Sequence, residues 1–390
     1  MKVLFTCVVG HGHFNPMVPL ARALEGAGHR VAVATDPGFC GHVRDVGFEA
    51  YPAGLDQPDA QARFVAATPG WADIPPADRM PFQFPGLFAG VRAPRMVEDL
   101  EPLMESWRPD LVIHETSELA GAIVAESRGI AHAEHSFGIV RAAMVRAVAT
   151  EILAPIAARL GVQDPGISGS NGELYLDICP PGIQQPEIAD VAHVQRIRPG
   201  GINEDQKGAL PRWVADLPGR PTVYVTMGTV FNKSAETFLT VLDGLRTENV
   251  TVIVTLGDSG DLALLGPQPD NVHVERYIAQ SLLLPHCDLV ISHAGSGATV
   301  GALAAGVPML AIPQGADQFV NAEAISRIGA GLRLLPSEFT ATGVRDATRE
   351  LLSDRRFTDV ARAEQAAILE MPTPASVVPR LEALARNGSA

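Results

Sequence analysis

The sequence has few residues that would cross-link the chain or anchor it in a membrane. Its 390 residues include four cysteines, at positions 7, 40, 179 and 287, and none of them forms a Cys-x-x-Cys pair. Buried free thiols of this kind are typical of a reducing compartment. No apolar run approaches the ~20 residues that span a bilayer, and the first apolar run ends at Gly10, too early for a signal peptide. We therefore expect a cytoplasmic protein with no membrane partner.

Positive charge is scarce as well. Lys and Arg number 30 against 44 Asp and Glu, so the formal net charge is −14. A broad acidic surface repels nucleic acids and anionic lipids, which excludes both as expected partners. A small anionic ligand would have to be held locally, by backbone dipoles and a few placed side chains. We expect small-molecule ligands and a chain that is a monomer or a homodimer.

The length and the apolar pattern predict two α/β domains. A chain of 390 residues is too long for one ordinary core, and 46% of its residues are apolar. Short apolar runs alternate with helical periodicity in both halves, which predicts two doubly wound parallel sheets. We place an N-terminal domain at residues 1–205, a linker at 206–221 and a C-terminal domain at 222–372. Residues 373–390 are expected to form a helix that packs back on the N-terminal domain.

Individual elements follow from the same pattern. In the N-terminal half we expect strands at Lys2–Val9, Arg30–Thr35, Leu111–His114 and Ile130–Glu134, and helices that start at Asn15 as N-cap and that span Leu119–Ser127. In the C-terminal half we expect strands at Thr222–Thr226, Thr251–Thr255, Val272–Val274, Leu289–Ser292, Met309–Ile312 and Leu332–Leu334, and helices at Ser234–Leu245, Ala298–Ala305 and Phe319–Ile328. The Pro-rich segment Pro58–Pro94 lacks a clear period, which is typical of a binding loop or lid.

The most informative motif follows the strand Leu289–Ser292. It reads His293-Ala294-Gly295-Ser296-Gly297, and a helix is expected to open at Ala298. Glycines let the backbone approach a ligand, and the N-terminal end of a helix favours an anion. We therefore expect this loop to bind phosphate groups, with His293 donating a hydrogen bond. The alternative is a tight turn that needs glycine for its backbone alone.

Two further segments are candidates for contact with the same ligand. Asp317 and Gln318 follow the next strand, at the sheet edge where open α/β folds bind ligands, and their side chains suit sugar hydroxyls. Alternatively, Asp317 only caps the helix that follows. Tyr277 and Ile278 come after an earlier strand, where the ring is placed to stack on a base and the backbone to bind its polar rim. The alternative is that Tyr277 packs in the core.

A candidate general base lies after the first strand. The loop Gly10–Asn15 contains His11 and His13, and a neutral histidine is the best general base near pH 7. Such a base needs an acceptor that orients its other nitrogen. Glu115 stands at the carboxyl end of a strand that should lie beside the first one, so we expect a His13–Glu115 pair. The alternatives are a histidine that caps a helix and a solvated carboxylate at position 115.

These motifs together resemble the family 1 glycosyltransferases, in particular bacterial enzymes that glycosylate natural products. The resemblance is carried by GHGHFNPMVPLARAL at Gly10–Leu24, YVTMGT at Tyr224–Thr229 and the run from Glu275 to Asn321, and it covers nearly the whole chain. It implies the GT-B fold, in which two Rossmann-like domains face each other across a cleft. It also implies an inverting transfer that uses a nucleotide diphosphate sugar as co-substrate, with no metal and no other cofactor. The sequence has no Asp-x-Asp triplet that would hold a metal.

The resemblance also assigns roles to residues. His13 matches the catalytic base, and Glu115 stands where many relatives have the Asp that orients it. From the motifs and the resemblance together, the expected donor-binding residues are Gly12, Thr229, Tyr277, Ile278, His293, Gly295, Ser296, Gly297, Ala298, Asp317 and Gln318. The chain departs from the family pattern at Tyr277, where Trp is usual, at Ala279, where Pro is usual, and at Ala298, where Ser or Thr is frequent.

The acceptor is expected to be apolar or aromatic, such as a polyketide aglycone in antibiotic biosynthesis. Its expected contacts are Phe82, Phe84, Phe88, His135 and Phe137, unless these side chains only pack the core. The donor carries dTDP or UDP, and the resemblance favours dTDP deoxysugars.

Three other functions are open at this point. The same base would serve transfer to a carbon atom of a phenolic ring. A non-catalytic protein of the same fold would bind nucleotide or aglycone without reaction. A nicotinamide-dependent oxidoreductase is imitated by Gly10-x-Gly12 and by Asp36 after the second strand, although Asn15 replaces the third glycine of that fingerprint.

Overall fold

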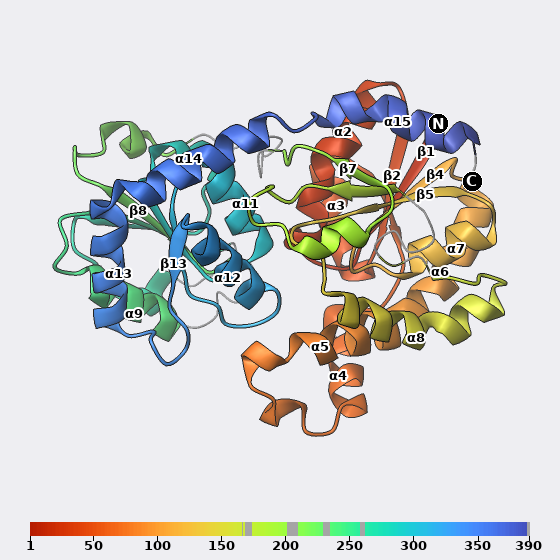
Figure 1. Cartoon of the computed structure of the whole chain (residues 1–390), viewed down its shortest axis with the longest axis horizontal. Coiled ribbons are helices and arrows are strands. Elements are labelled where there is room, and N and C mark those ends of the chain that lie inside the picture. Colours follow the sequence, from red (N-terminus) through yellow and green to blue (C-terminus); the bar gives the residue numbers. More distant parts are fainter. Residues whose placement is uncertain (166, 168–173, 201–209, 229–234, 258–261, 388–390) are drawn as a thin grey trace. The chain divides into compact units, whose positions relative to one another are not determined.

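The computed structural model describes residues 1–165, 167, 174–200, 210–228, 235–257 and 262–387, which form two compact units (Figure 1). Unit 1 comprises Met1–Cys179, Gln184–Gly200 and Met371–Ala390. Unit 2 comprises Pro180–Ile183 and Gly201–Glu370. Each unit has its own parallel sheet, so the predicted fold class is confirmed.

Unit 1 is built on a seven-stranded sheet in the order β3-β2-β1-β4-β5-β6-β7, and every adjacent pair is parallel. Its strands are β1 (Lys2–Thr6), β2 (Arg30–Thr35), β3 (Glu49–Pro52), β4 (Leu111–Glu115), β5 (Ala131–His135), β6 (Leu174–Asp177) and β7 (Val194–Arg196). Its α-helices are α1 (His11–Phe14), α2 (Val18–Gly26), α3 (Cys40–Val46), α4 (Gln57–Ala67), α5 (Met80–Gln83), α6 (Ala93–Trp107), α7 (Ala120–Ser127), α8 (Ala143–Arg159) and α15 (Pro374–Asn387). A nine-residue π-helix, Phe84–Arg92, joins α5 to α6.

The sheet of unit 1 is buried on both faces, because successive strand residues point to opposite sides. In β1, Val3 and Phe5 belong to a core that includes residues of α2, α3 and α15. Leu4 belongs to a second core that includes residues of α6 and α7. Helices therefore cover both faces, which is the doubly wound arrangement.

Helix α15 belongs to unit 1 although it follows unit 2 in the chain. It places Val377, Val378 and Leu381 in the same core as β1 and α2, and in Figure 1 it runs beside α2. Its Glu382 has Oε1 at 3.0 Å from Nε2 of His29. The N-terminal core is thus completed by the last helix of the chain.

Unit 2 is built on a six-stranded parallel sheet in the order β10-β9-β8-β11-β12-β13. Its strands are β8 (Thr222–Thr226), β9 (Thr251–Thr255), β10 (Val272–Glu275), β11 (Leu289–Ser292), β12 (Met309–Ala311) and β13 (Gly331–Arg333). Its α-helices are α9 (Ala235–Leu245), α10 (Gln280–Leu283), α11 (Ser296–Ala305), α12 (Gln318–Ile328), α13 (Ala341–Ser353) and α14 (Arg355–Leu369). Strands β8, β9 and β11 have the predicted bounds.

Two helix starts differ from the prediction by more than one residue. Asn15 is not an N-cap, because the helical turn α1 already begins at His11 and Asn15 has helical backbone angles (φ −56°, ψ −38°). Helix α11 begins at Ser296 rather than Ala298, with Gly295 at its N-cap.

The segment Pro58–Pro94 is largely helical rather than an irregular loop. Pro85 and Pro94 lie inside the continuous helical run from α5 through the π-helix to α6, whereas Pro58 and Pro81 stand in the first turn of a helix. The missing N–H of proline is tolerated there, since first-turn N–H groups have no partner within the helix. Pro58 and Pro81 therefore mark helix starts and not a loop.

Candidate active site

The topological switch point of the unit 1 sheet, where the strand order reverses, lies between β1 and β4. From this point the strand order continues through β2 to β3 on one side and through β5 to β7 on the other. Open α/β sheets bind ligands outside the carboxyl ends of the strands at such a switch point. His13 lies on α1, just after β1, and Glu115 is the last residue of β4. The topology therefore brings the two residues to one edge of the sheet.

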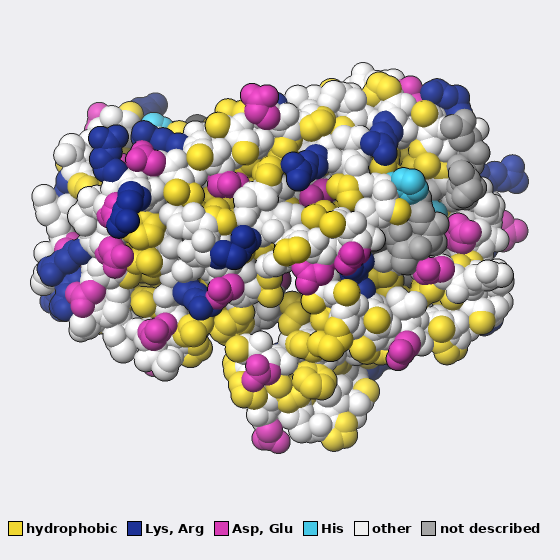
Figure 2. All heavy atoms as spheres, viewed as in Figure 1, with side chains coloured by type: hydrophobic (Ala, Val, Ile, Leu, Met, Phe, Trp, Pro, Cys, Tyr) yellow, Lys and Arg dark blue, Asp and Glu magenta, His cyan; other side chains and the backbone are white. Residues whose placement is uncertain are grey.

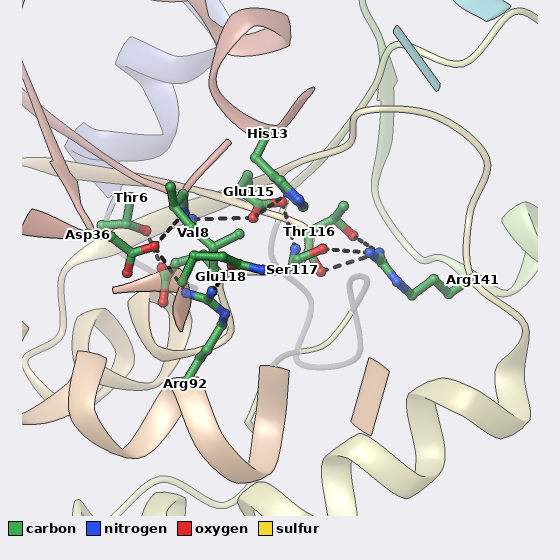
Figure 3. Close-up of polar contacts among 12 residues, drawn as sticks. Thr6, Val8, His13, Asp36, Arg92, Glu115, Thr116, Ser117, Glu118 and Arg141 are labelled. Carbon is green, nitrogen blue, oxygen red and sulfur yellow. Dashed lines mark hydrogen bonds and ion pairs between the residues drawn. The ribbon is translucent and has the colours of Figure 1, made fainter. Parts of the chain in front are cut away.

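His13 and Glu115 form a close pair at this edge (Figure 3). Nδ1 of His13 lies 3.0 Å from Oε1 of Glu115, and the side chains are 23% and 1% exposed, respectively. Two backbone N–H groups hold the carboxylate of Glu115. Oε2 accepts the N–H of Ser117 at 2.7 Å, and Oε1 accepts that of Val8 at 3.5 Å. Nδ1 has no aligned hydrogen bond with any described residue, so the pair is in contact by distance without the geometry of a hydrogen bond.

His11, the other histidine of this turn, packs elsewhere. Its ring centroid lies 4.3 Å from that of His42 and 5.4 Å from that of Phe39. Of the two histidines singled out in the sequence, His13 is the one whose ring nitrogen lies beside Glu115.

Two of the five expected acceptor residues lie beside His13. The ring of Phe137 meets that of His13 edge to face at 5.0 Å, and the ring of Phe88 lies at 6.2 Å. Phe84 is 1% exposed and lies behind Phe88, at 5.5 Å between centroids. Phe82, on α5, is 54% exposed. It lies in a region over α4 and α5 where Figure 2 shows many apolar side chains.

His135, the fifth expected acceptor residue, is buried. It ends β5, pairs in register with Glu115 and is 1% exposed. Burial lowers the pKa of His135 to about 4, so its imidazole is neutral at pH 7. The residue therefore lies behind the pair rather than on a surface that an acceptor would touch.

Arg141 was not predicted from the sequence but lies next to this site (Figure 3). Its Nη1 donates to Oγ1 of Thr116 at 2.9 Å, and its Nη2 donates to Oγ of Ser117 at 2.6 Å. Its Cζ lies 5.3 Å from the ring centroid of Phe137. The positive charge of Arg141 therefore lies beside Phe137, whose ring packs against His13. No local motif marks position 141, and only the fold brings it beside the end of β4.

In unit 2 the switch point lies between β8 and β11. His293 directly follows β11 and is 8% exposed. Its ring lies between two glycines: a Cβ at Gly228 would lie 2.6 Å from Cε1, and one at Gly295 would lie 2.6 Å from Nε2. Burial lowers the pKa of His293 to about 4, with the charge of Asp317 opposing the shift. The ring is therefore neutral at pH 7 and can donate a hydrogen bond without a charge.

Gly228 belongs to the YVTMGT motif, but the sequence did not reveal its role. Its φ of +68° also favours glycine at this position. The motif can now be explained in part, because position 228 must leave room for the imidazole of His293.

The start of α11 is suited to an anion. The N–H groups of Ser296, Gly297 and Ala298 belong to its first turn, and the first bond within the helix is from Thr299 N–H to Gly295 C=O. First-turn N–H groups and the helix dipole together attract negative charge. The loop therefore has the form predicted for a phosphate-binding turn.

Asp317 connects this loop to the next one. It occupies the N-cap position of α12, yet its side chain makes no capping bond. Its Oδ2 accepts Oγ–H of Ser296 at 2.6 Å and Nδ2–H of Asn321 at 3.1 Å. Nδ2 of Asn321 also donates to the carbonyl of Ala294 at 2.9 Å, and Ala294 has a left-handed φ of 60°. Asn321, which the sequence did not single out, thus holds a strained turn in place.

Gln318 is placed differently from a residue that would bind sugar through its carbonyl oxygen. It is 1% exposed, and Oε1 accepts the N–H groups of Gln314 at 2.8 Å and Gly315 at 3.0 Å. The side chain therefore shapes the loop that follows β12.

The other expected donor residues are dispersed. Tyr277 is 43% exposed, so it is not a core residue, whereas Ile278 is 5% exposed. Gly12 is exposed on α1 of unit 1. Thr229 lies outside the described residues.

Two other ligand classes have little support in the described ranges. These residues contain no group of three or more His, Cys, Asp or Glu side chains able to hold a metal ion. Asp36, the acid that imitates a dinucleotide fingerprint, is 2% exposed and paired with Arg92, so it does not face a ribose. No helix in the described part of the chain is long and apolar enough to cross a membrane.

Comparison with family models gives two adjacent matches. Residues 81–228 match the N-terminal domain described as erythromycin biosynthesis protein CIII-like, and residues 239–384 match the corresponding C-terminal domain. The chain is 33% identical to the L-demethylnoviosyl transferase of Streptomyces niveus, over 99% of both chains. It is 32% identical to the elloramycin glycosyltransferase ElmGT of Streptomyces olivaceus, over 98% of this chain and 97% of the relative.

Solved structures are similar over the same length. The spinosyn rhamnosyltransferase SpnG superposes with a TM-score of 0.83 at 26% identity, over 98% of this chain and 100% of its own. The glycosyltransferase VinC in complex with dTDP superposes with a TM-score of 0.81 at 25% identity, over 100% of both chains.

Proposed function

Because the chain belongs to the family of erythromycin biosynthesis protein CIII-like glycosyltransferases, we propose that it transfers a deoxysugar from dTDP to a hydroxyl group of a small natural-product acceptor. Relatives are named as transferases of L-demethylnoviosyl, mycaminosyl and desosaminyl groups. VinC and SpnG have been solved with thymidine diphosphate bound. These names support dTDP over UDP as the carrier.

The observation that carries the proposal is the contact between His13 and Glu115. With Nδ1 facing the carboxylate, Nε2 is the nitrogen left to take a proton from the acceptor hydroxyl. The acceptor oxygen then attacks the anomeric carbon, the bond to the diphosphate breaks, and the configuration inverts. Glu115 stabilises the imidazolium that forms. Phe88 and Phe137 supply an apolar wall for an aromatic or polyketide acceptor.

Unit 2 supplies the other half of the reaction. The leaving diphosphate gains negative charge as the sugar departs, and the first turn of α11 with the neutral ring of His293 would stabilise that charge. Tyr277 would stack on the base, and Asp317 would bind a sugar hydroxyl. The nucleotide sugar is the co-substrate, and the proposal includes no metal and no other cofactor.

Mass spectrometry of the purified protein with dTDP- and UDP-sugars and with phenolic and polyketide acceptors tests the proposal. The expected result is a glycoside with a dTDP-sugar donor, whose anomeric configuration by NMR is opposite to that of the donor. The same anomeric configuration in product and donor would refute a single-displacement mechanism. Diphosphate binding without transfer to any acceptor would instead support a non-catalytic binding protein, and an acid-stable sugar linkage would support transfer to carbon.

A further inference from the structure

An ion pair between Asp36 and Arg92 is buried in unit 1 and takes no part in the mechanism above. Asp36 directly follows β2 and is 2% exposed, and Arg92 ends the π-helix and is 4% exposed. Nη1 of Arg92 donates to Oδ2 of Asp36 at 3.0 Å (Figure 3). A buried ion pair adds little stability, because the loss of hydration offsets the attraction. Its position therefore calls for another explanation.

The carboxylate of Asp36 holds the start of the turn that carries His13. The same Oδ2 accepts the backbone N–H of Val9 at 2.7 Å. Val9 directly precedes Gly10, where the chain turns into α1 with a φ of 134°. One carboxylate oxygen therefore fixes the backbone four residues before His13.

The guanidinium of Arg92 holds the end of the π-helix. Besides Asp36, Nη1 donates to the carbonyl of Leu55 at 3.2 Å, and Nη2 donates to Oε1 of Gln57. Phe88, on the same π-helix, approaches the ring of His13. Stretches of π-helix are rare and are frequently found at functional sites.

Neighbouring residues pack closely around the carboxylate of Asp36. Gly54 has a φ of +97°, and a Cβ there would lie 2.9 Å from Oδ1 of Asp36 and 3.2 Å from Sδ of Met96. A small cavity beside the pair is lined by residues that include Val8, Phe88 and Glu118. Burial raises the pKa of Asp36 to about 6 in spite of Arg92, so the carboxylate is mostly ionised at pH 7.

We propose that Asp36 and Arg92 are positioning residues that tie the π-helix bearing Phe88 to the turn bearing His13. Phe88 stands on the acceptor side of His13, so the pair fixes the distance between the base and the wall against which the acceptor lies. This inference rests on the proposed function of His13 as the base.

Three variants test the pair. Arg92→Met removes the charge and the ties but keeps much of the side-chain volume. The double variant Asp36→Asn with Arg92→Met also removes the unpaired carboxylate, so it guards against simple misfolding. Arg30→Met is the matched control, because Arg30 lies on β2, the strand that Asp36 follows, and forms an exposed ion pair with Glu49 of β3.

We expect both variants of the pair to lower kcat by about 10- to 100-fold, since small misplacements of reacting groups cost rate on this scale. The KM for the donor should stay within about threefold, because the donor loops lie in unit 2. Amide hydrogen exchange of residues 8–14 should become faster in both variants and remain unchanged in Arg30→Met. A merely structural pair would lower the unfolding temperature and leave kcat per folded molecule unchanged.

A folded double variant with wild-type kcat and wild-type exchange of residues 8–14 would overturn the inference. The exchange measurement needs no turnover, so it tests whether the Asp36–Arg92 pair holds residues 8–14 even if no sugar is transferred. Absence of transfer by the wild-type protein would refute the proposed function instead.

Discussion

Replacement of Glu115 by Gln tests the His13–Glu115 pair most directly, because the change removes one charge and adds no volume. At 3.0 Å, opposite unit charges attract by about 5 kcal/mol at the effective dielectric constant of ~20 that suits protein sites. The imidazolium is only partly formed in the transition state, and His13 is 23% exposed. We therefore expect a loss of roughly 2–3 kcal/mol, which is about 30- to 150-fold in kcat.

The hydrogen bonds of Glu115 make the loss larger rather than smaller. In the variant, the amide oxygen must accept the N–H of Ser117, which Oε2 accepts at 2.7 Å in the wild type. The amide NH₂ then faces His13 and donates to Nδ1, which places the ring proton on Nε2. That tautomer cannot take a proton from the acceptor, so the total loss should approach 10³-fold, about the upper range for a misoriented base.

The assay is steady-state transfer with saturating donor and acceptor, with the product quantified by chromatography. His13→Ala should lose roughly 10²–10⁴-fold, and the double variant should be no worse than His13→Ala, because the two residues act as a unit. Calorimetric titration of dTDP should give wild-type affinity in all three variants, which shows that they are folded. Losses that multiply in the double variant, or a Glu115→Gln enzyme with more than about a third of wild-type kcat, would refute the pairing.

Four other outcomes are expected. His293→Ala should weaken dTDP binding by about tenfold or more and leave thymidine binding unchanged, since a hydrogen bond to a charged phosphate contributes roughly 1.5–3 kcal/mol; equal dTDP affinity in calorimetry would remove the ring from the donor site. Gly228→Ala should reduce dTDP affinity similarly, because its Cβ would displace that ring; wild-type affinity would speak against this packing. The pKa of His135 is about 4 in the folded protein and about 6.5 when unfolded, so the unfolded chain binds more protons between these values and stability falls as the pH falls. His135→Leu should flatten that dependence by at most about 1.4 kcal/mol per pH unit, near pH 5.3, in urea unfolding at pH 4.5–6.5, whereas an unchanged slope would show that His135 does not titrate this way. Transfer should survive EDTA, and activity lost to the chelator and restored by magnesium would contradict a metal-independent reaction.

The strands were predictable because burial on both faces produces short, continuous apolar runs. Arg30–Thr35 and Thr222–Thr226 are strands with the predicted bounds for this reason. The helices between Pro58 and Pro94 were not predictable from periodicity, because proline can start a helix, as Pro58 does, but also ends helices elsewhere. A proline in the sequence does not reveal which of the two it does.

Site residues could be predicted where strand topology brings them together. Residues whose positions depend only on tertiary packing could not be predicted from the sequence. The pairing of His13 with Glu115 followed from the adjacency of two strands in a parallel sheet. Arg141 was missed because its partners Thr116 and Ser117 lie 24 or more positions away, and the role of Asn321 was missed because its bond to the carbonyl of Ala294, 27 positions away, is defined only by the fold. The role of Gly228 was missed because it is defined by the ring of His293, 65 residues further on.

The return of α15 to unit 1 has a consequence for synthesis and for protein engineering. The ribosome must synthesise α15 before the core around Val377 and Leu381 can close, so unit 2 can finish folding before unit 1 does. A chimera that exchanges unit 2 between relatives at a single junction near residue 200 would give unit 1 a foreign α15. Exchanging residues 201–370 alone keeps the native helix with its own core, and hybrids with two junctions should therefore be recovered folded more often than hybrids with one.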